Sequence, residues 1–292
     1  SDLMKNHTSF KIGGPAAALC APKNRRQLRE LVGFVQREGV DSWYIGNGSN
    51  LLVSDKGLNG IAILLDSSFD GEIEVDGTVL LAPAGKKLSA VCAAACAAGL
   101  TGLEFAYGIP GSVGGAVYMN AGAYGGEMKD VITHVTACTL DGHTLSYTNE
   151  EMAFGYRQSA VSRAGQPIAI TSVTVALSKG DEETIRATMR EFNARRREKQ
   201  PLALPSCGST FKRPEGRFAG TMIDQCGLKG LRVGGASVST LHAGFLVNDE
   251  NGTAADFLAL IAKVQQAVWE KEGVRLEPEV RILGEDAPVS VL

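Results

Sequence analysis

The chain has 292 residues, of which 44% are hydrophobic and 21% charged, and this is enough for two or three globular units with buried cores. A formal net charge of −3 excludes a global basic field that would attract nucleic acid or an anionic membrane. No signal peptide or membrane-spanning run is recognisable, so we expect a cytoplasmic protein without nucleic-acid or membrane partners.

The first part of the chain predicts a β-α-β-β unit. Apolar residues recur with helical spacing over residues 25–38, at Leu28, Leu31, Val32 and Val35. Strands are expected at 17–21, 43–45, 51–53 and 61–65. The strand at 43–45 runs into Gly46-Asn47-Gly48-Ser49-Asn50, so a polar glycine loop follows a strand end.

The middle of the chain predicts a second unit that is rich in strands. A hairpin is expected around Asp76-Gly77, and a small-residue helix over 88–98 ends at Gly99. A second glycine-rich loop covers 110–116. Further strands are expected at 132–140, 143–147 and 168–176.

The last part predicts a long polar helix over 182–199, ended by Pro201, a short helix over 221–226, a strand over 243–248 and an amphipathic helix over 254–272. Strands and helices do not alternate strictly, so we predict an α+β fold. The basic run Arg195-Arg196-Arg197-Glu198-Lys199 is typical of a solvated helix face, and an anion site is the alternative.

The cysteines show no paired C-x-x-C spacing, which favours reduced and mostly buried thiols in a reducing compartment. They are Cys20, Cys92, Cys96, Cys138, Cys207 and Cys226. No cluster of His, Cys, Asp and Glu has metal-ligand spacing, so we predict no metal site.

The two glycine loops, 46–50 and 110–116, suit a diphosphate, because glycines let several backbone N–H groups face one cluster of oxygens. Neither loop matches the dinucleotide fingerprint G-x-G-x-x-G or the P-loop, so a Rossmann or P-loop site is not expected. A plain turn is the alternative for either loop alone. The two together indicate a large phosphate-bearing ligand.

Eight segments, in this order, resemble the UDP-N-acetylenolpyruvoylglucosamine reductase family across nearly the whole chain. They are 7–16 (HTSFKIGGPA), 46–52 (GNGSNLL), 109–116 (IPGSVGGA), 120–125 (NAGAYG), 155–159 (GYRQS), 208–214 (GSTFKRP), 223–230 (IDQCGLKG) and 276–281 (LEPEVR). Each segment is weak evidence alone, whereas eight in family order are specific. The short interval between Arg157 and Ser209 resembles the family's second type, which lacks an extra substrate-covering loop.

The resemblance implies a vanillyl-alcohol-oxidase-type FAD-binding fold in two lobes, plus a C-terminal substrate domain, with the final strand returning to the first lobe. The implied boundaries are 1–65 with 273–292, 66–199, and 200–272. The implied activity is the reduction of the enolpyruvyl group of UDP-N-acetylglucosamine enolpyruvate to UDP-N-acetylmuramate, a peptidoglycan precursor. FAD is the implied non-covalent cofactor and NADPH the co-substrate, in a protein expected to be a monomer.

The resemblance also implies site residues. Those implied to bind FAD are Tyr44, Gly46, Asn47, Gly48, Ser49, Asn50, Pro110, Gly111, Ser112, Gly114, Gly115, Ala116, Asn120 and Gly122. Those implied to bind substrate are Tyr156, Lys199, Lys212, Gln225 and His242. The implied catalytic residues are Arg157, Ser209 and Glu279. Lys199 as a solvated helix end and His242 as a structural histidine remain alternatives.

The chemistry of the implied reaction can be compared with the three catalytic residues. Negative charge develops on the substrate carbon beside the carboxylate, and an arginine such as Arg157 suits that charge because its planar fork stays cationic. Ser209 is a weak acid, but it can protonate a strong base within hydrogen-bond reach. Glu279 helps only if it is protonated or paired with a cation. Taken singly, each residue is more often structural.

Two other functions remain open on the sequence. A different oxidase of the same flavin fold would need a His or Cys placed for covalent flavin attachment. A non-catalytic phosphate-binding module would carry no flavin. Cys207 stands where a small residue is expected, and a reactive role for it is the less favoured reading.

Overall fold

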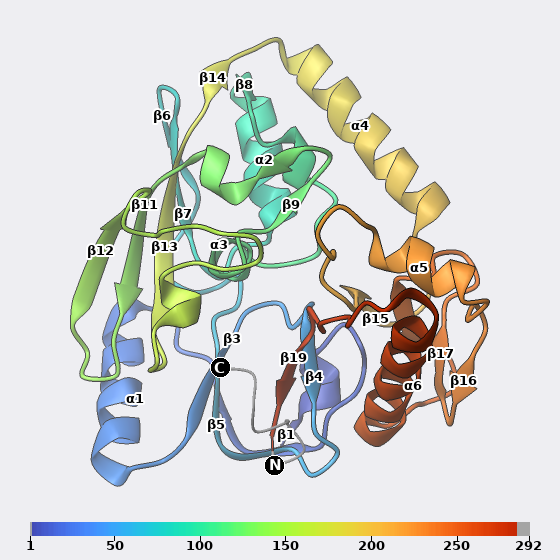
Figure 1. The fold of residues 1–292 in the computed structure, drawn as a ribbon. Coiled ribbons are helices and arrows are strands. Elements are labelled where there is room, and N and C mark those ends of the chain that lie inside the picture. Colours follow the sequence, from blue (N-terminus) through green and yellow to red (C-terminus); the bar gives the residue numbers. More distant parts are fainter. Residues whose placement is uncertain (1, 285–292) are drawn as a thin grey trace. The chain divides into compact units, whose positions relative to one another are not determined.

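The computed structural model describes residues 2–284, which fall into two compact units. In the described part, 2–17, 48–59 and 197–284 form the first unit, and 18–47 and 60–196 form the second. Three elements run through the unit boundaries: β2 (Pro15–Cys20), β5 (Leu58–Leu64) and α4 (Glu182–Lys199). Figure 1 traces the elements in chain order.

The three-part division expected from the resemblance differs from these two units, and it stays a prediction. The expected division keeps residues 1–65 together in one lobe, whereas the compact units, which are defined by spatial contact, place 18–47 with 60–196. Residues 285–292 of the expected first lobe lie outside the described residues.

The second unit contains a five-stranded antiparallel sheet in the order β12-β11-β13-β7-β6. The strands are β6 (Glu74–Asp76), β7 (Val79–Pro83), β11 (Ile132–Cys138), β12 (Thr144–Thr148) and β13 (Ala169–Ala176). The predicted hairpin is confirmed, since Asp76 pairs with Val79. The helices α2 (Leu88–Ala97) and α3 (Val113–Tyr118) lie beside this sheet and share one apolar core with it (Figure 1).

Helix α1 (Arg25–Glu38) begins and ends at the predicted residues. Asn24 caps its start by accepting a hydrogen bond from the Gln27 N–H, and Gly39 ends it in a left-handed conformation. The parallel pair β3 (Ser42–Ile45) and β5 lies in register with Tyr44 opposite Ile63. Leu28, Val32 and Ile63 belong to the same buried cluster.

The remaining elements of the second unit are short. They are β8 (Leu100–Thr101), η2 (Glu104–Ala106), β9 (Gly122–Ala123), β10 (Gly126–Glu127), η3 (Met128–Asp130), η4 (Val161–Arg163) and β14 (Ser178–Lys179). β8 pairs with β14, and β9 pairs with β10, both antiparallel.

The first unit contains a four-stranded antiparallel sheet in the order β15-β18-β17-β16. Its elements are β1 (Asp2–Leu3), η1 (Met4–His7), β4 (Leu51–Val53), β15 (Ser206–Ser209), α5 (Ala219–Gln225), β16 (Arg232–Val233), β17 (Ala236–Val238), β18 (Phe245–Asn248), α6 (Ala254–Glu272) and β19 (Arg281–Leu283). Phe10 and Phe257 meet in its core with ring centroids 4.3 Å apart.

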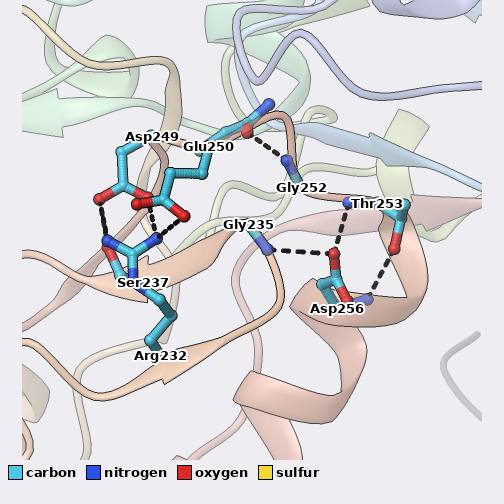
Figure 2. Close-up of polar contacts among 9 residues, drawn as sticks. Arg232, Gly235, Ser237, Asp249, Glu250, Gly252, Thr253 and Asp256 are labelled. Atoms are coloured by element: carbon cyan, nitrogen blue, oxygen red, sulfur yellow. Dashed lines mark hydrogen bonds and ion pairs between the residues drawn. The ribbon is translucent and has the colours of Figure 1, made fainter.

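Polar contacts fix the start of α6 and the hairpin beside it (Figure 2). Thr253 Oγ1 accepts from the Asp256 N–H, and Asp256 Oδ2 accepts from the N–H groups of Thr253 and Gly235 at 2.9 and 3.3 Å. Arg232 holds Asp249 through two hydrogen bonds of 2.8 and 2.7 Å. The predicted helix over 254–272 is confirmed, and the structure adds a capping box formed by Thr253 and Asp256 at its start.

The last described strand completes an early part of the first unit. β19 pairs in parallel with β4, with Arg281 opposite Leu51 and Leu283 opposite Val53. The expected return of the final strand to the early chain is thus confirmed. Within residues 2–284, no helix combines the length and apolarity that a membrane crossing requires.

Candidate functional site

The glycine loop after β3 is packed too closely for side chains at two positions. A Cβ at Gly46 would overlap Ser112 Oγ, so residues from the two glycine segments are adjacent within the second unit. Gly48 has a φ of +61°, and a Cβ there would overlap the His7 carbonyl oxygen within the first unit. The Ser9 N–H donates to the Gly48 carbonyl at 3.1 Å.

The second glycine segment is only partly a loop, so its interpretation as a loop over 110–116 is wrong from Val113 onward. Ser112 caps α3, accepting a hydrogen bond from the Gly115 N–H at 3.3 Å. Gly114 lies where a Cβ would come within 2.8 Å of the Ala84 Cβ, so the helix start lies close to the end of β7. The glycines here permit close packing as well as turning.

The backbone offers donors for an anionic ligand at both glycine segments. The N–H groups of Val113 and Gly114 already donate to the carbonyls of Lys86 and Ala84, each at 2.9 Å. The N–H groups of Gly48 and Ser112, which are buried residues, meet no acceptor among residues 2–284. A backbone N–H that has no acceptor in the protein is a donor that an anionic ligand can use.

Two buried polar side chains in the second unit also carry atoms that lack partners among the described residues. Tyr44 packs against the cluster of α1, its hydroxyl meets no partner among the described residues, and burial raises the pKa of this phenol. Arg196, in α4, has Nε and Nη1 buried and unpaired, directly against Gly108. Burial lowers the pKa of Arg196, so its charge needs an anionic or acceptor partner.

The charged run over 195–199 predicts a solvated helix face, and this is wrong for Arg196, which is only 9% exposed. Its neighbour Arg195 is exposed and pairs with Glu191 as expected. The buried guanidinium instead favours the anion-site alternative. One turn before Arg196 on the same helix, Phe192 stacks on Tyr124 at 4.3 Å and accepts a hydrogen bond from its hydroxyl through the backbone carbonyl.

Arg157 lies at the tip of a tight turn in the second unit. The Gly155 and Gln158 backbones bond to each other, and Arg157 has a φ of +56°, a left-handed conformation uncommon for arginine. Its guanidinium lies 5.1 Å from the centre of the Tyr156 ring. Strained backbone of this kind is frequent at functional sites.

Asn120 holds that turn. Its side chain is fully buried, with Nδ2 donating to the Gly155 carbonyl at 3.0 Å and Oδ1 accepting from the Lys129 N–H at 2.9 Å. The Asn120 carbonyl in turn accepts from Arg157 at 3.5 Å, as does the carbonyl of Gly122. Both ends of the Asn120 amide are therefore used inside the protein, where they hold the turn, and the implied contact of Asn120 with FAD stays a prediction.

In the first unit, Thr210 links the backbone beside Ser209 to the backbone of Glu279. The Thr210 carbonyl accepts from the Glu279 N–H at 2.7 Å, and Ser209 immediately precedes Thr210. Asn50, at the end of the glycine loop, donates to the Glu279 carbonyl at 3.1 Å. The loop, the exposed Ser209 and the half-buried Glu279 thus form one connected backbone arrangement.

The predicted substrate residues of the first unit lie in different settings. Lys212 pairs with Glu277 at 3.0 Å, beside the Glu279 segment. Lys199 is exposed at the end of α4, and Gln225 is exposed at the end of α5. His242 precedes β18, where its Nδ1 accepts from the Gly244 N–H at 3.1 Å.

All six cysteines are free, and four of them are buried. Burial raises the pKa of the Cys207 thiol to about 12, so it remains protonated and unreactive near neutral pH. In the described part of the chain, no group of three or more His, Cys, Asp and Glu could hold a metal ion.

Two family models match the chain. One, described as an FAD binding domain, covers residues 16–148. The other, described as the C-terminal domain of UDP-N-acetylenolpyruvoylglucosamine reductase, covers residues 200–283. The first spans both glycine segments, and the second spans Ser209, His242 and Glu279.

Whole-chain relatives carry the same name. The UDP-N-acetylenolpyruvoylglucosamine reductase of Limosilactobacillus fermentum is 50% identical over 96% of this chain and 92% of its own length, and that of Caldanaerobacter subterraneus is 47% identical over 97% and 92%. The crystal structure of the enzyme from Thermus caldophilus aligns with a TM-score of 0.81 at 35% identity, over 97% of this chain and 98% of that one. The chain therefore belongs to the UDP-N-acetylenolpyruvoylglucosamine reductase family.

Proposed function

We propose that this protein reduces the enolpyruvyl group of UDP-N-acetylglucosamine enolpyruvate to UDP-N-acetylmuramate, using FAD and NADPH, in peptidoglycan precursor synthesis. The observation that carries the proposal is the convergence of Asn50, Ser209 and Glu279 around Thr210 in a chain of this family. It is a monomeric cytoplasmic enzyme with a small-molecule substrate and without nucleic-acid or membrane partners. The interval between Arg157 and Ser209 is short, and on this ground the chain is assigned to the second type of the family, which lacks the extra substrate-covering loop.

The residues present fit FAD. In the second unit, the Ser112 N–H suits an oxygen of its diphosphate, and the close contact between Gly46 and Ser112 keeps side chains away from the backbone there. Arg196 supplies a buried cation near Gly108, and its Nε and Nη1 meet no acceptor among residues 2–284. When bound, FAD supplies the hydride carrier between NADPH and the substrate.

Arg157 stabilises the charge that develops on the substrate carboxylate. The turn that carries it is braced by Asn120, so the guanidinium is held in place before substrate binds. Preorganised positive charge of this kind stabilises a developing anion without a cost of reorganisation during the reaction. Tyr156 beside it supplies an exposed ring for the substrate.

Ser209 gives its hydroxyl proton to the substrate carbon, and Glu279 orients the substrate from the neighbouring segment. Ser209 belongs to the end of β15 opposite Phe245, so the strand pairing limits its movement. Lys199 and Lys212 suit the substrate diphosphate, and Gln225 and His242 add polar contacts.

An anaerobic titration tests the function directly. NADPH should bleach the flavin absorbance of the purified holoenzyme, and one equivalent of the enolpyruvyl nucleotide sugar should restore it with formation of UDP-N-acetylmuramate. UDP-N-acetylglucosamine, which lacks the enolpyruvyl group, is the control and should leave the flavin bleached. A flavin that NADPH bleaches but the enolpyruvyl sugar does not restore would exclude this substrate, and a protein without flavin would exclude the oxidoreductase.

A further inference from the structure

Gln265 is a polar residue on the buried side of α6. Ile261 and Val268, one turn before and after it on the helix, are both buried, and Gln265 itself is half-buried. A side-chain amide in such a place needs hydrogen-bond partners inside the protein. Its neighbour Gln266 is exposed instead, and its Nε2 donates along the helix to Glu270 at 2.6 Å.

The partner of Gln265 lies between α6 and the last described strand. Gln265 Nε2 donates to the carbonyl of Leu276 at 2.8 Å, and Leu276 is buried. Helix α6 ends at Gly273, and residues 274–277 belong to no helix or strand. Among residues 2–284, no other group is hydrogen-bonded to the backbone of 274–276, so this one side chain fixes that part of the chain.

The chain beyond Leu276 is held by backbone groups of the same unit. The Lys212 N–H donates to the Glu277 carbonyl at 2.8 Å, and the Glu279 N–H donates to the Thr210 carbonyl at 2.7 Å. Backbone partners therefore fix the segment from Glu277 onward, whereas a side chain fixes its beginning.

The residues between Leu276 and Glu279 form a stiff link. Pro278 has a fixed φ, and a proline also restricts the residue before it, here Glu277, to extended backbone. Few rotations are then left that could absorb a displacement of the Leu276 carbonyl. Such a displacement is passed along the chain to Glu279.

We propose that Gln265 is a positioning residue for the reaction: by holding the Leu276 carbonyl, it sets the place from which Glu279 meets the substrate. This rests on the proposed function, in which Glu279 orients the substrate. Gln265 acts through Glu279, so its loss slows the reduction of the substrate and leaves the reduction of FAD by NADPH unchanged.

Removal and return of the donor test this role. Gln265→Met keeps the length of the side chain without a donor, and Gln265→His returns a ring N–H at a similar reach. Stopped-flow absorbance follows both half-reactions of the holoenzyme. Reoxidation by the enolpyruvyl sugar should be about ten-fold slower in Gln265→Met, and Gln265→His should recover most of the loss, while reduction by NADPH stays within about two-fold of wild type. Gln266→Met is the matched control and should equal wild type in both steps.

A second substitution shows whether the effect passes through Glu279. In a Glu279→Gln background, adding Gln265→Met should slow reoxidation by less than about two-fold, because the group that Gln265 positions has already been changed. Losses that simply multiply in the double variant would mean that Gln265 acts by another route, and they would overturn the proposal.

Folding is measured separately, by the melting temperature and the FAD content of each variant. If Gln265→Met does not retain FAD, Gln265→Glu gives the same comparison, since it keeps the shape of the side chain and loses the donor when ionised. Its defect in reoxidation should shrink as the pH falls and the carboxyl regains a proton that it can donate.

Failure of this inference can be separated from failure of the function. If the enolpyruvyl sugar reoxidises the wild-type protein and the donor-free variants are slowed equally in both half-reactions, or in neither, the positioning role is wrong and the function stands. If the wild-type flavin is reduced by NADPH and the enolpyruvyl sugar does not reoxidise it, the function itself is wrong, and the role of Gln265 falls with it.

Discussion

Gly48 excludes a side chain for two separable reasons, its left-handed backbone and its contact with His7. Gly77 has the same φ of +61° but no atom within 4 Å of the place that a Cβ would take, so it isolates the backbone effect. We expect Gly77→Ala to lower the free energy of unfolding by about 1 kcal/mol, and Gly48→Ala by about 3 kcal/mol or more, with weaker FAD binding. Urea unfolding of the two variants measures this, and equal losses would contradict the close approach to His7.

If Ser209 is the proton donor, its substitution should affect only one of the two half-reactions. Ser209→Ala should leave flavin reduction by NADPH within about two-fold of wild type, and slow reoxidation by the enolpyruvyl sugar by about 100-fold, because only the second step needs the proton. Stopped-flow absorbance follows both steps. Ser206→Ala, at the other end of β15, is the control. Equal slowing of both half-reactions would refute the assignment.

At the site, the sequence predicts the types of the functional residues better than it predicts what surrounds them. The motif positions of Ser209 and Glu279 could be matched, whereas their connection through Thr210 follows from strand pairing that no spacing reveals. Arg196 was hidden within a charged run, because only tertiary packing distinguishes a buried guanidinium from its exposed neighbours. Asn120 is the opposite case. Its place in a motif predicts a ligand contact, whereas in the structure its side chain holds the turn at Gly155 by a hydrogen bond.

At the scale of elements, helices with caps and apolar periodicity were predicted to the residue, as α1 and α6 show. Helix α3 was missed because its glycines have low helix propensity, and it forms where Gly114 packs against Ala84. The prediction of a loop is wrong for this segment because tertiary packing outweighs the low helix propensity of its glycines.

Asp256, at the start of α6, should make the free energy of unfolding depend on pH. Its carboxylate accepts from the N–H groups of Thr253 and Gly235, which lowers its pKa in the folded state. A lowered folded pKa contributes stability that is present above the unfolded value and lost as the pH falls through the folded one. Asp256→Asn should therefore cost about 0.5–1 kcal/mol at neutral pH, and this difference should shrink as the pH falls below the ordinary pKa of an aspartate and through the lowered pKa of Asp256.

Urea unfolding of wild type and Asp256→Asn across this pH range measures the effect of the charge. Glu74→Gln, on the exposed β6, is the control and should show a small difference at every pH. A difference between wild type and Asp256→Asn that persists unchanged in acid would show that the carboxylate charge is not what stabilises the helix start.

At the scale of the whole molecule, the sequence predicted the α+β class, and the FAD binding domain and the Thermus caldophilus structure confirm it. The resemblance implied the return of the final strand to the early chain, whereas the division of the early chain itself, with 48–59 in the first unit and 18–47 in the second, could not be predicted. Hydrophobic periodicity describes faces of elements, and it carries no information on partners hundreds of residues away.

If FAD is bound without a covalent bond, unfolding of the whole protein should release it. Acid precipitation of the holoenzyme should leave the flavin in the supernatant and the pellet colourless. The melting temperature should rise with added FAD, since a ligand that binds only the folded state stabilises it by mass action. A yellow pellet would indicate covalent attachment and favour a different oxidase of the same flavin fold.

The pairing of β4 with β19 has a consequence for the order in which the protein folds during synthesis. Leu51–Val53 emerge from the ribosome early, but their partner strand Arg281–Leu283 is made more than 200 residues later. At about 5–20 residues per second, that interval is on the order of tens of seconds. The early segments of the first unit must wait, while residues 60–196 already have their internal partners, so the arrangement that joins Asn50 to Glu279 is among the last parts of the molecule to form.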